Sequence, residues 1–321
     1  MTNTMSGNAG TISAGLRMAW PARRPSGRAV LVVLLMAGLA LSSRGVNAIA
    51  LSGMSAAGPE RAAPAVTETA ALQAEARRLL AQYRGNPPAL RDSAGAALAA
   101  GRNDATVAVF LKLRWAGRLR AGLERYGAML ASADVQQLAF AAAGVQRYGA
   151  QLHNGLLLDG PSRLITVSIH DQRLIAYDGG RVVVDAPVTT GRPALPTDIG
   201  AMRVMRKDAP WTMQSPWPKG SPEWYPDTVV QMVVWFTRNG EGLHDASWQP
   251  ASTLGPGSQY GPFASHGCIH VPLAAVKALF EWAPTGTPVV VYPGDGSPVA
   301  SQAQQQSVDA MGNPIGGVRG A

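Results

Sequence analysis

The hydrophobic pattern of this chain changes its period once, at Leu164, and this change limits the possible folds more than any other feature. Before it, apolar residues recur at helical spacing, as in TETAALQAEARRLLAQY from Thr67 to Tyr83. After it, apolar and polar residues alternate through RLITVSIHDQRLIAYDGGRVVVDAP, which predicts two or three strands with a hairpin turn at Asp178-Gly179-Gly180. The pattern therefore predicts an α+β multidomain protein with a helical domain first.

The helical domain is expected over residues 69–155. Further helices are predicted in the stretch that begins at Asp104, with breaks near Gly127 and at Ser132-Ala133-Asp134. The Leu and Ala stripes are typical of a bundle core and carry no recognisable chemistry. The role of this domain stays open among a spacer, a wall-binding module and a partner surface.

The β-rich domain is expected over residues 161–292, with mainly antiparallel strands. Later strands are predicted in AMRVMR, VVQMVVWFT and TPVVVYP, and one helix is predicted from Leu273 to Ala283. The remaining residues, 293–321, are rich in Gly, Ser, Gln and Pro, so we expect a disordered tail.

Positive charge is concentrated at the N-terminus. Residues 1–48 hold five arginines and no acidic residue, whereas the rest of the chain has 23 basic and 20 acidic residues. That balance, with no interleaved Arg and aromatic stripe, excludes nucleic-acid binding. The apolar run Ala29–Leu41 after the first arginines is too short to span a bilayer unaided, since helical residues rise about 1.5 Å each and the core is about 30 Å thick.

Residues 1–48 are therefore predicted to be a cleaved export signal, or a signal anchor if retained. Either outcome places the protein outside the cytoplasm, with membrane contact only if the leader is kept. Residues 49–68 are rich in Ala, Gly, Ser and Pro and are predicted to be a linker.

The stretch ASHGCIHVP contains Cys268, the only cysteine of the chain, between His266 and His270. A single cysteine cannot form an intramolecular disulfide, so its presence in an exported protein indicates a role for the free thiol. A cysteine becomes nucleophilic through a base close in space, and His244, which follows a predicted strand, suits that role. A helix soon after Cys268 is expected to lower its pKa and to help supply oxyanion donors.

Three other interpretations stay open at this point. His244, His266, Cys268 and His270 are ligand types that zinc accepts, although their spacing of one intervening residue is atypical. Cys268 is also compatible with a buried structural thiol in a binding module. Ser265 as nucleophile with His266 is disfavoured because no Gly-x-Ser-x-Gly elbow is present.

Several segments in order resemble the L,D-transpeptidase catalytic domain (YkuD family) over about residues 161–292. They are APVTTGRPALPTDIGAMRV, GLHDASW, SHGCIH and the closing GTPVVVY. The resemblance implies a sandwich-like, mixed-sheet domain that acts on peptidoglycan stem peptides outside the cytoplasmic membrane, without a cofactor or metal. It also implies a part in cell-wall biogenesis and cell shape.

In that family the cysteine attacks the bond before the terminal D-Ala of a tetrapeptide, and a neighbouring stem amine resolves the thioester as a 3→3 cross-link. The alternatives are an L,D-carboxypeptidase, with water as acceptor, and a catalytically silent protein that binds wall peptide or glycan. The resemblance makes Cys268 the nucleophile and His244 the favoured base, with His266 as the other candidate. Ser265, His266 and Gly267 are expected to form the oxyanion loop with Cys268.

Further residues are expected to contact substrate or to shape the site. His270 stands where the family commonly has Arg or Asn, so donor recognition is expected to differ. Asp198 stands where the family has Pro, which is a change in a loop. The carbonyl of Asp245 is a candidate for orienting an imidazole. The Trp-rich stretch from Lys207 to Pro226 is expected to cover the cleft, with Trp224 and Tyr225 as candidate substrate contacts.

Overall fold

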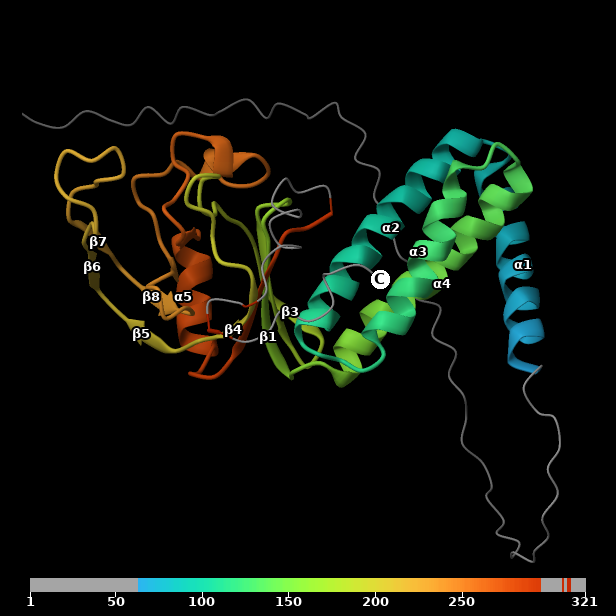
Figure 1. Cartoon of the computed structure of the whole chain (residues 1–321), viewed down its shortest axis with the longest axis horizontal. Coiled ribbons are helices and arrows are strands. Elements are labelled where there is room, and N and C mark those ends of the chain that lie inside the picture. Colours follow the sequence, from blue (N-terminus) through green and yellow to red (C-terminus); the bar gives the residue numbers. More distant parts are fainter. Residues whose placement is uncertain (1–62, 296–307, 309–310, 313–321) are drawn as a thin grey trace, which may run out of the picture. The chain divides into compact units, whose positions relative to one another are not determined.

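A computed structural model describes residues 63–295, 308 and 311–312, and it places a helical region before a β-rich region (Figure 1). The helices of the first region are α1 (Ala63–Tyr83), α2 (Pro87–Phe110), α3 (Ala116–Ala128) and α4 (Val135–Asp159). Buried Leu and Ala side chains from all four helices form one core, as the helical periodicity predicts. The break at residues 132–134 is confirmed, because the Asp134 carboxylate caps α4 by accepting the backbone N–H of Gln136 at 2.7 Å.

Two boundaries of this region differ from the prediction. Helix α1 begins at Ala63, inside the predicted linker, and Pro64 in its first turn is compatible with helix because the first turn needs no backbone donor. Helix α2 begins at Pro87 and includes Gly95 and Gly101, which obscured its pattern in the sequence. Asn86 caps it, with Oδ1 accepting the N–H of Ala89 at 3.2 Å.

The β-rich region contains two principal sheets and a short hairpin. In chain order its strands are β1 (Arg163–Ser168), β2 (Arg173–Asp178), β3 (Arg181–Pro187), β4 (Gly200–Arg203), β5 (Arg206–Asp208), β6 (Trp211–Met213), β7 (Thr228–Val230), β8 (Val233–Trp235), β9 (Gly242–His244), β10 (Ile269–His270) and β11 (Pro288–Tyr292). The five-stranded sheet has the order β3-β2-β1-β11-β4, and the four-stranded sheet has the order β10-β9-β8-β5.

Both sheets are mixed rather than purely antiparallel. Strand β1 pairs parallel with β11, and β9 pairs parallel with β10, while their other neighbours are antiparallel. The predicted hairpin turn is present between β2 and β3, where Gly179 and Gly180 have positive φ angles of 53° and 79°.

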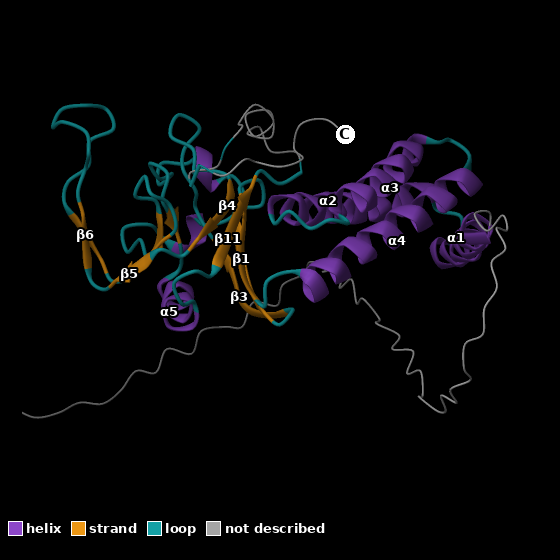
Figure 2. Cartoon of the chain, turned by 60° about the horizontal axis from the view of Figure 1, so that its bottom comes forward, coloured by secondary structure: helices purple, strands orange, loops and turns teal. Residues whose placement is uncertain are grey.

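One apolar core joins the two sheets and helix α5 (Leu273–Trp282). Buried residues from strands of each sheet meet Val276 and Leu279 of α5 in the same cluster. Figure 2 shows α5 beside these strands. Close packing of the helix on the strands fixes the position of the start of α5 relative to the end of β10. This core is the scaffold for the residues around Cys268.

The segment VVQMVVWFT is not one strand, as its pattern predicted, but two strands in different sheets. Strand β7 pairs with β6, and β8 joins the four-stranded sheet. The chain leaves the ladder at Gln231 and Met232, whose backbone N–H groups donate to Asp245 Oδ1 at 2.8 and 3.0 Å. The Asp245 carboxylate thus replaces the backbone carbonyls that a neighbouring strand would otherwise offer to these two N–H groups.

The predicted tail is held at its start. The backbone N–H of Asp295 donates to Asn103 Oδ1 at 3.0 Å, and Arg102 lies 3.4 Å from the Asp295 carboxylate. Met311 packs against the β-rich core. The predicted leader, and most of the predicted linker and tail, lie outside the described residues. In the part of the chain that the structure covers, no helix is both long and apolar enough to cross a membrane.

Candidate active site

Parallel strands β9 and β10 join the chain segments that carry His244 and Cys268. The register pairs His270 with His244, and Cys268 precedes His270 by two residues. Cys268 itself is a bend residue directly before β10, so it lies at the start of that strand and not within the ladder. The Cys268 thiol lies 3.8 Å from the Gly240 carbonyl oxygen.

His244 is oriented by the carbonyl of the residue that follows it. Its Nδ1 lies 2.8 Å from the Asp245 carbonyl oxygen, which can only accept, so Nδ1 carries the proton. In the neutral ring Nε2 is then the acceptor. Burial lowers the pKa of His244, opposed by that hydrogen bond, which keeps the ring in the neutral form that a general base requires.

The Cys268 thiol is only partly exposed and is protonated at rest. Burial raises its pKa to about 12, while the N–H of Gly242 acts in the opposite direction. The expected lowering by the following helix is therefore wrong, because α5 begins only at Leu273, beyond the two residues of β10. A protonated thiol needs a base at the moment of attack.

The loop before Cys268 closes as a tight turn. The Ser265 hydroxyl donates to the Cys268 carbonyl oxygen and accepts the Gly267 N–H at 3.1 Å. The Gly267 N–H is thus already bonded within the loop, and the oxyanion role expected of Ser265, His266 and Gly267 stays a prediction. The N–H groups of His266 and Cys268 donate to none of the residues that the structure describes.

Gly267 is required by its conformation and by its neighbour. Its φ is +125°, and an added Cβ would lie 2.6 Å from Glu241 Oε1. Glu241 itself is deeply placed, and burial raises the pKa of its carboxyl well above the ordinary value. The Asp198 N–H donates to both of its oxygens, at 3.3 and 3.2 Å. The sequence analysis missed Glu241, since a lone acid between two glycines carries no pattern.

Two segments singled out by the resemblance hold this loop. Thr197 donates its hydroxyl proton to the Gly267 carbonyl at 2.7 Å and accepts the Gly191 N–H at 2.9 Å. Gly191 forms a bridge with Ser265. Arg192 donates to the carbonyls of Ala264 and Ser265 at 2.9 and 3.3 Å. The nucleophile loop is thereby fixed from one side by backbone and side-chain bonds together.

His266 points to a different group of residues from His244. Its Nε2 lies 3.2 Å from Glu223 Oε2, and its ring packs 5.2 Å from the rings of both Trp217 and Tyr225. Burial, and then the nearby Arg192, lower the pKa of His266. Because Glu223 occupies its Nε2, this geometry favours His244 rather than His266 as the base.

His270 is buried beside His244, with ring centroids 5.1 Å apart. Its Nδ1 lies 2.8 Å from Gln249 Oε1, while the Gln249 amide donates to Thr189 Oγ1 at 2.7 Å. Burial, and next the two neighbouring histidines, lower the pKa of His270 well below its ordinary value. A buried, bonded ring acts on the site by packing against His244 rather than by exposure to the cleft.

The remaining predicted contacts divide. Tyr225 is near the site, since its ring packs on His266 and its hydroxyl donates to the Gln214 carbonyl at 3.0 Å. Trp224 is exposed, and the Lys219 Nζ atom lies 5.7 Å from the centroid of its ring. The described contacts of Trp224 do not include Cys268. The Asp245 carboxylate is buried on backbone donors, which leaves its carbonyl as the group that serves the site.

The four residues considered for zinc do not converge. Each imidazole has a different partner: His266 contacts Glu223, His270 contacts Gln249, and His244 contacts the Asp245 carbonyl. Among the described residues, no group of three or more His, Cys, Asp or Glu side chains is placed to hold a metal ion.

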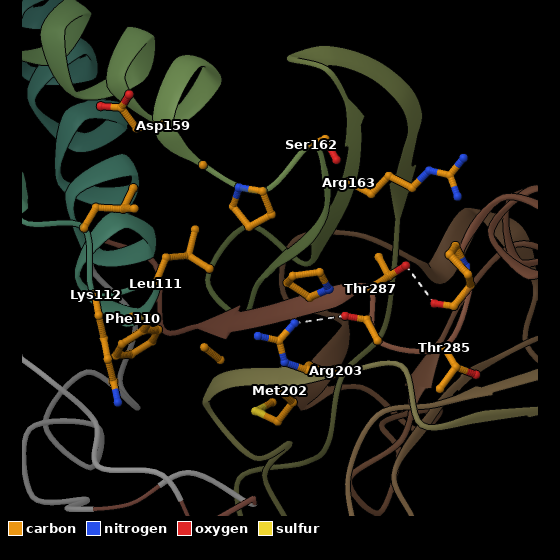
Figure 3. Close-up of a pocket in the computed structure, with 17 residues that line it drawn as sticks. Phe110, Leu111, Lys112, Asp159, Ser162, Arg163, Met202, Arg203, Thr285 and Thr287 are labelled. Atoms are coloured by element: carbon orange, nitrogen blue, oxygen red, sulfur yellow. Dashed lines mark hydrogen bonds between the residues drawn. The ribbon is translucent and has the colours of Figure 1, made fainter.

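A cavity of about 800 Å³ lies elsewhere, between the helical region and one end of the five-stranded sheet (Figure 3). Asp159, Arg163, Met202 and Arg203 are among its lining residues, and Arg203 donates to the Gly286 carbonyl at 3.0 Å. None of its lining residues is a cysteine or a histidine. Cys268 and the three histidines around it therefore lie outside this cavity.

Comparison with known proteins agrees with this geometry. The profile of the YkuD family, described as the L,D-transpeptidase catalytic domain, matches residues 162–291. These residues are an L,D-transpeptidase catalytic domain. The domain contains every residue discussed above around Cys268. No curated protein sequence gives a significant match.

Solved structures of bacterial L,D-transpeptidases are similar to this domain. An Enterococcus faecium L,D-transpeptidase C442S mutant has 30% identity and a TM-score of 0.37, covering 41% of this chain and 50% of its own. The E. faecium catalytic domain acylated by ertapenem has 30% identity and a TM-score of 0.35, with coverages of 41% and 97%. An L,D-transpeptidase from Mycobacterium smegmatis has 25% identity and a TM-score of 0.36, with coverages of 41% and 59%. The chain thus spans half the length of the first of these.

Proposed function

We propose that this protein is an exported cysteine L,D-transpeptidase that joins peptidoglycan stem peptides. The observation that carries the proposal is the position of Cys268 directly before β10, the strand whose His270 pairs with His244 of β9, with the His244 Nδ1 proton held by the Asp245 carbonyl. A protonated thiol beside a neutral, oriented imidazole is the arrangement that base-assisted acyl transfer requires. Export rests on the layout of residues 1–48, and the family match supports the substrate class.

The first half-reaction forms a thioester. His244 Nε2 takes the thiol proton as Cys268 Sγ attacks the carbonyl that precedes the terminal D-Ala of a tetrapeptide stem. The N–H groups of His266 and Cys268 are available to the developing oxyanion. The C–N bond then breaks, and the amine of D-Ala leaves with the proton from His244.

The second half-reaction returns the enzyme to its first state. A side-chain amine of a neighbouring stem attacks the thioester carbonyl and passes a proton to His244. The C–S bond breaks, the sulfur recovers that proton, and a 3→3 cross-link is released. With water in place of the amine, the same steps give a tripeptide, the product of a carboxypeptidase.

A carbapenem tests the proposed nucleophile, because its strained β-lactam carbonyl acylates a base-activated thiol. Intact-protein mass is measured for the full chain and for Cys268→Ala after incubation with ertapenem. The proposal expects a ligand-sized mass gain on the parent alone. A folded parent that gains no mass would instead support a silent wall-binding protein.

The acceptor is tested separately with a stem tetrapeptide. A cross-linked dimer with loss of alanine supports transpeptidation, whereas tripeptide alone supports the carboxypeptidase. Liquid chromatography with mass detection distinguishes these two products.

A further inference from the structure

A second cavity, of about 580 Å³, opens beside the nucleophile. Gly240 lines it, and the carbonyl oxygen of Gly240 lies 3.8 Å from the Cys268 sulfur. Tyr225, whose ring packs on His266, lines it as well. A substrate carbonyl placed at the sulfur would therefore have its neighbouring groups at the mouth of this cavity.

Two arginines line the cavity, and only one is already paired. Arg206 lies 3.0 Å from the Asp208 carboxylate and 5.0 Å from the rings of both Trp211 and Trp235. Arg238 is exposed, and its guanidinium makes no hydrogen bond or ion pair with any residue between 63 and 295. The cavity thus presents one cation without a counter-charge.

The acidic groups near this wall do not neutralise Arg238. Asp198 accepts the Asn239 side-chain amide at 3.1 Å and makes no ion pair with Arg238. Burial raises the pKa of Glu241 well above its ordinary value, which favours the uncharged acid. A negatively charged ligand would consequently meet an attractive potential at Arg238.

The proposed substrate carries a carboxylate at the matching place. In a tetrapeptide stem the terminal carboxylate belongs to the D-Ala that leaves, one residue beyond the carbonyl that Cys268 attacks. Successive residues are about 3.8 Å apart, and Arg238 is only two residues from Gly240 at the sulfur. A planar guanidinium binds a carboxylate through two parallel hydrogen bonds.

We infer that Arg238 is a specificity residue that binds the terminal carboxylate of the leaving D-Ala. This restricts the donor to stems that end one residue after the scissile bond. The inference rests on the proposed function and adds the group that recognises the donor.

The test compares two donors on the full chain and on Arg238→Gln. One donor is the tetrapeptide with a free terminal carboxylate, and the other is the same peptide ending in a carboxamide. kcat/KM is measured from release of alanine or alaninamide. We expect the parent to prefer the acid by about 10- to 100-fold, the range of a charge-assisted hydrogen bond. Arg238→Gln is expected to lose that preference, with the amide donor unaffected.

Two further variants sharpen the result. Arg238→Lys is expected to retain part of the preference, since an ammonium keeps the charge but not the paired geometry. Arg203→Gln, in the other cavity, is expected to keep all of it. Because the Arg238 side chain has no described partner, Arg238→Gln is also expected to unfold at the parent's temperature.

The outcomes separate the inference from the function beneath it. A parent that acts on both donors equally, or an Arg238→Gln variant that keeps the preference for the acid, overturns the role of Arg238 alone. A folded parent that releases neither alanine nor alaninamide overturns the proposed function as well.

Discussion

At the scale of single residues, Gly267 links backbone conformation to the chemistry of the neighbouring thiol. Its φ of +125° strains any L side chain, and Glu241 fills the space where a Cβ would stand. Substituting Gly267→Ala is expected to cost about 1–3 kcal/mol of stability from the backbone. The displaced turn is expected to slow acylation by about 100-fold, since small misplacements of reacting groups have large effects on rate.

Gly220→Ala is the matched control for that variant. Gly220 also has a positive φ, +96°, but nothing lies within 4 Å of an added Cβ. It is expected to lose stability through its backbone while keeping the acylation rate, measured by time-resolved intact mass with ertapenem. Equal slowing in the two variants would show that the Glu241 contact has no part in holding the site.

The two buried histidines predict how stability depends on pH. Burial is the first cause that lowers the pKa of both His244 and His270, whereas the unfolded chain has the ordinary value of about 6.5. Below that pH the unfolded state takes up protons that the folded state does not. The free energy of unfolding is therefore expected to fall as the pH drops from about 6.5 towards the folded-state pKa values.

His270→Asn removes one of these groups and is expected to flatten the decline between about pH 7 and 5, measured by urea denaturation. His153 provides a control of opposite sign, because its hydrogen bond with Asp104 raises its pKa. The bond of protonated His153 to Asp104 stabilises the folded state at acid pH. His153→Asn is therefore expected to make the free energy of unfolding fall slightly more steeply as the pH drops. A His270→Asn curve parallel to that of the parent would contradict the assignment of a buried neutral ring.

At the scale of elements, the Asp245 carboxylate determines where strands β7 and β8 separate. It accepts two backbone N–H groups in the interior, and hydrogen bonds to a charged group are each worth about 1.5–3 kcal/mol. Asp245→Ala is expected to lower the free energy of unfolding by about 3–6 kcal/mol and to slow acylation, because the adjoining carbonyl orients His244. Asp245→Asn, which keeps an acceptor oxygen, is expected to retain more of both.

The measurement is a urea titration of the parent and both variants. Equal stability of Asp245→Ala and the parent would show that water, rather than the carboxylate, satisfies those two backbone groups.

Strands were predictable where the alternation of apolar and polar residues within one segment was enough to identify them. The pattern of β1, β2 and β3 predicted the strands and the glycine turn between β2 and β3. It failed at VVQMVVWFT because the acceptor that interrupts this segment comes from Asp245, fourteen positions after Gln231. The start of helix α2 was not predicted for a related reason, since its cap and glycines weaken the apolar period that the tertiary packing restores.

The site was predictable to a similar depth. Cys268, His244 and the Asp245 carbonyl could be named from motif residues. Glu241, Glu223 and Arg238 could not be, because their importance comes from loops that only the folded chain brings together. The pKa of Cys268 was predicted in the wrong direction, since burial by surrounding segments outweighs a helix that begins five residues later.

At the scale of the whole molecule, the helical region and the L,D-transpeptidase domain share part of a core. Val107 and Phe110 of α2 cluster with Leu164 of β1 and Val290 of β11. The Asp295 contacts with Asn103 and Arg102 add a polar connection to the same helix. The helical region therefore supports one sheet of the domain, while Cys268 lies at an edge of the other sheet.

The central claim is that Cys268 is the nucleophile for a peptide donor, and alanine release tests it most directly. The full chain and Cys268→Ala are each incubated with a stem tetrapeptide, and free D-Ala and covalent mass are measured together. The account predicts D-Ala release and a transient adduct of the donor minus alanine on the parent, and neither on the variant. Release of D-Ala by Cys268→Ala at the parent's rate would contradict it.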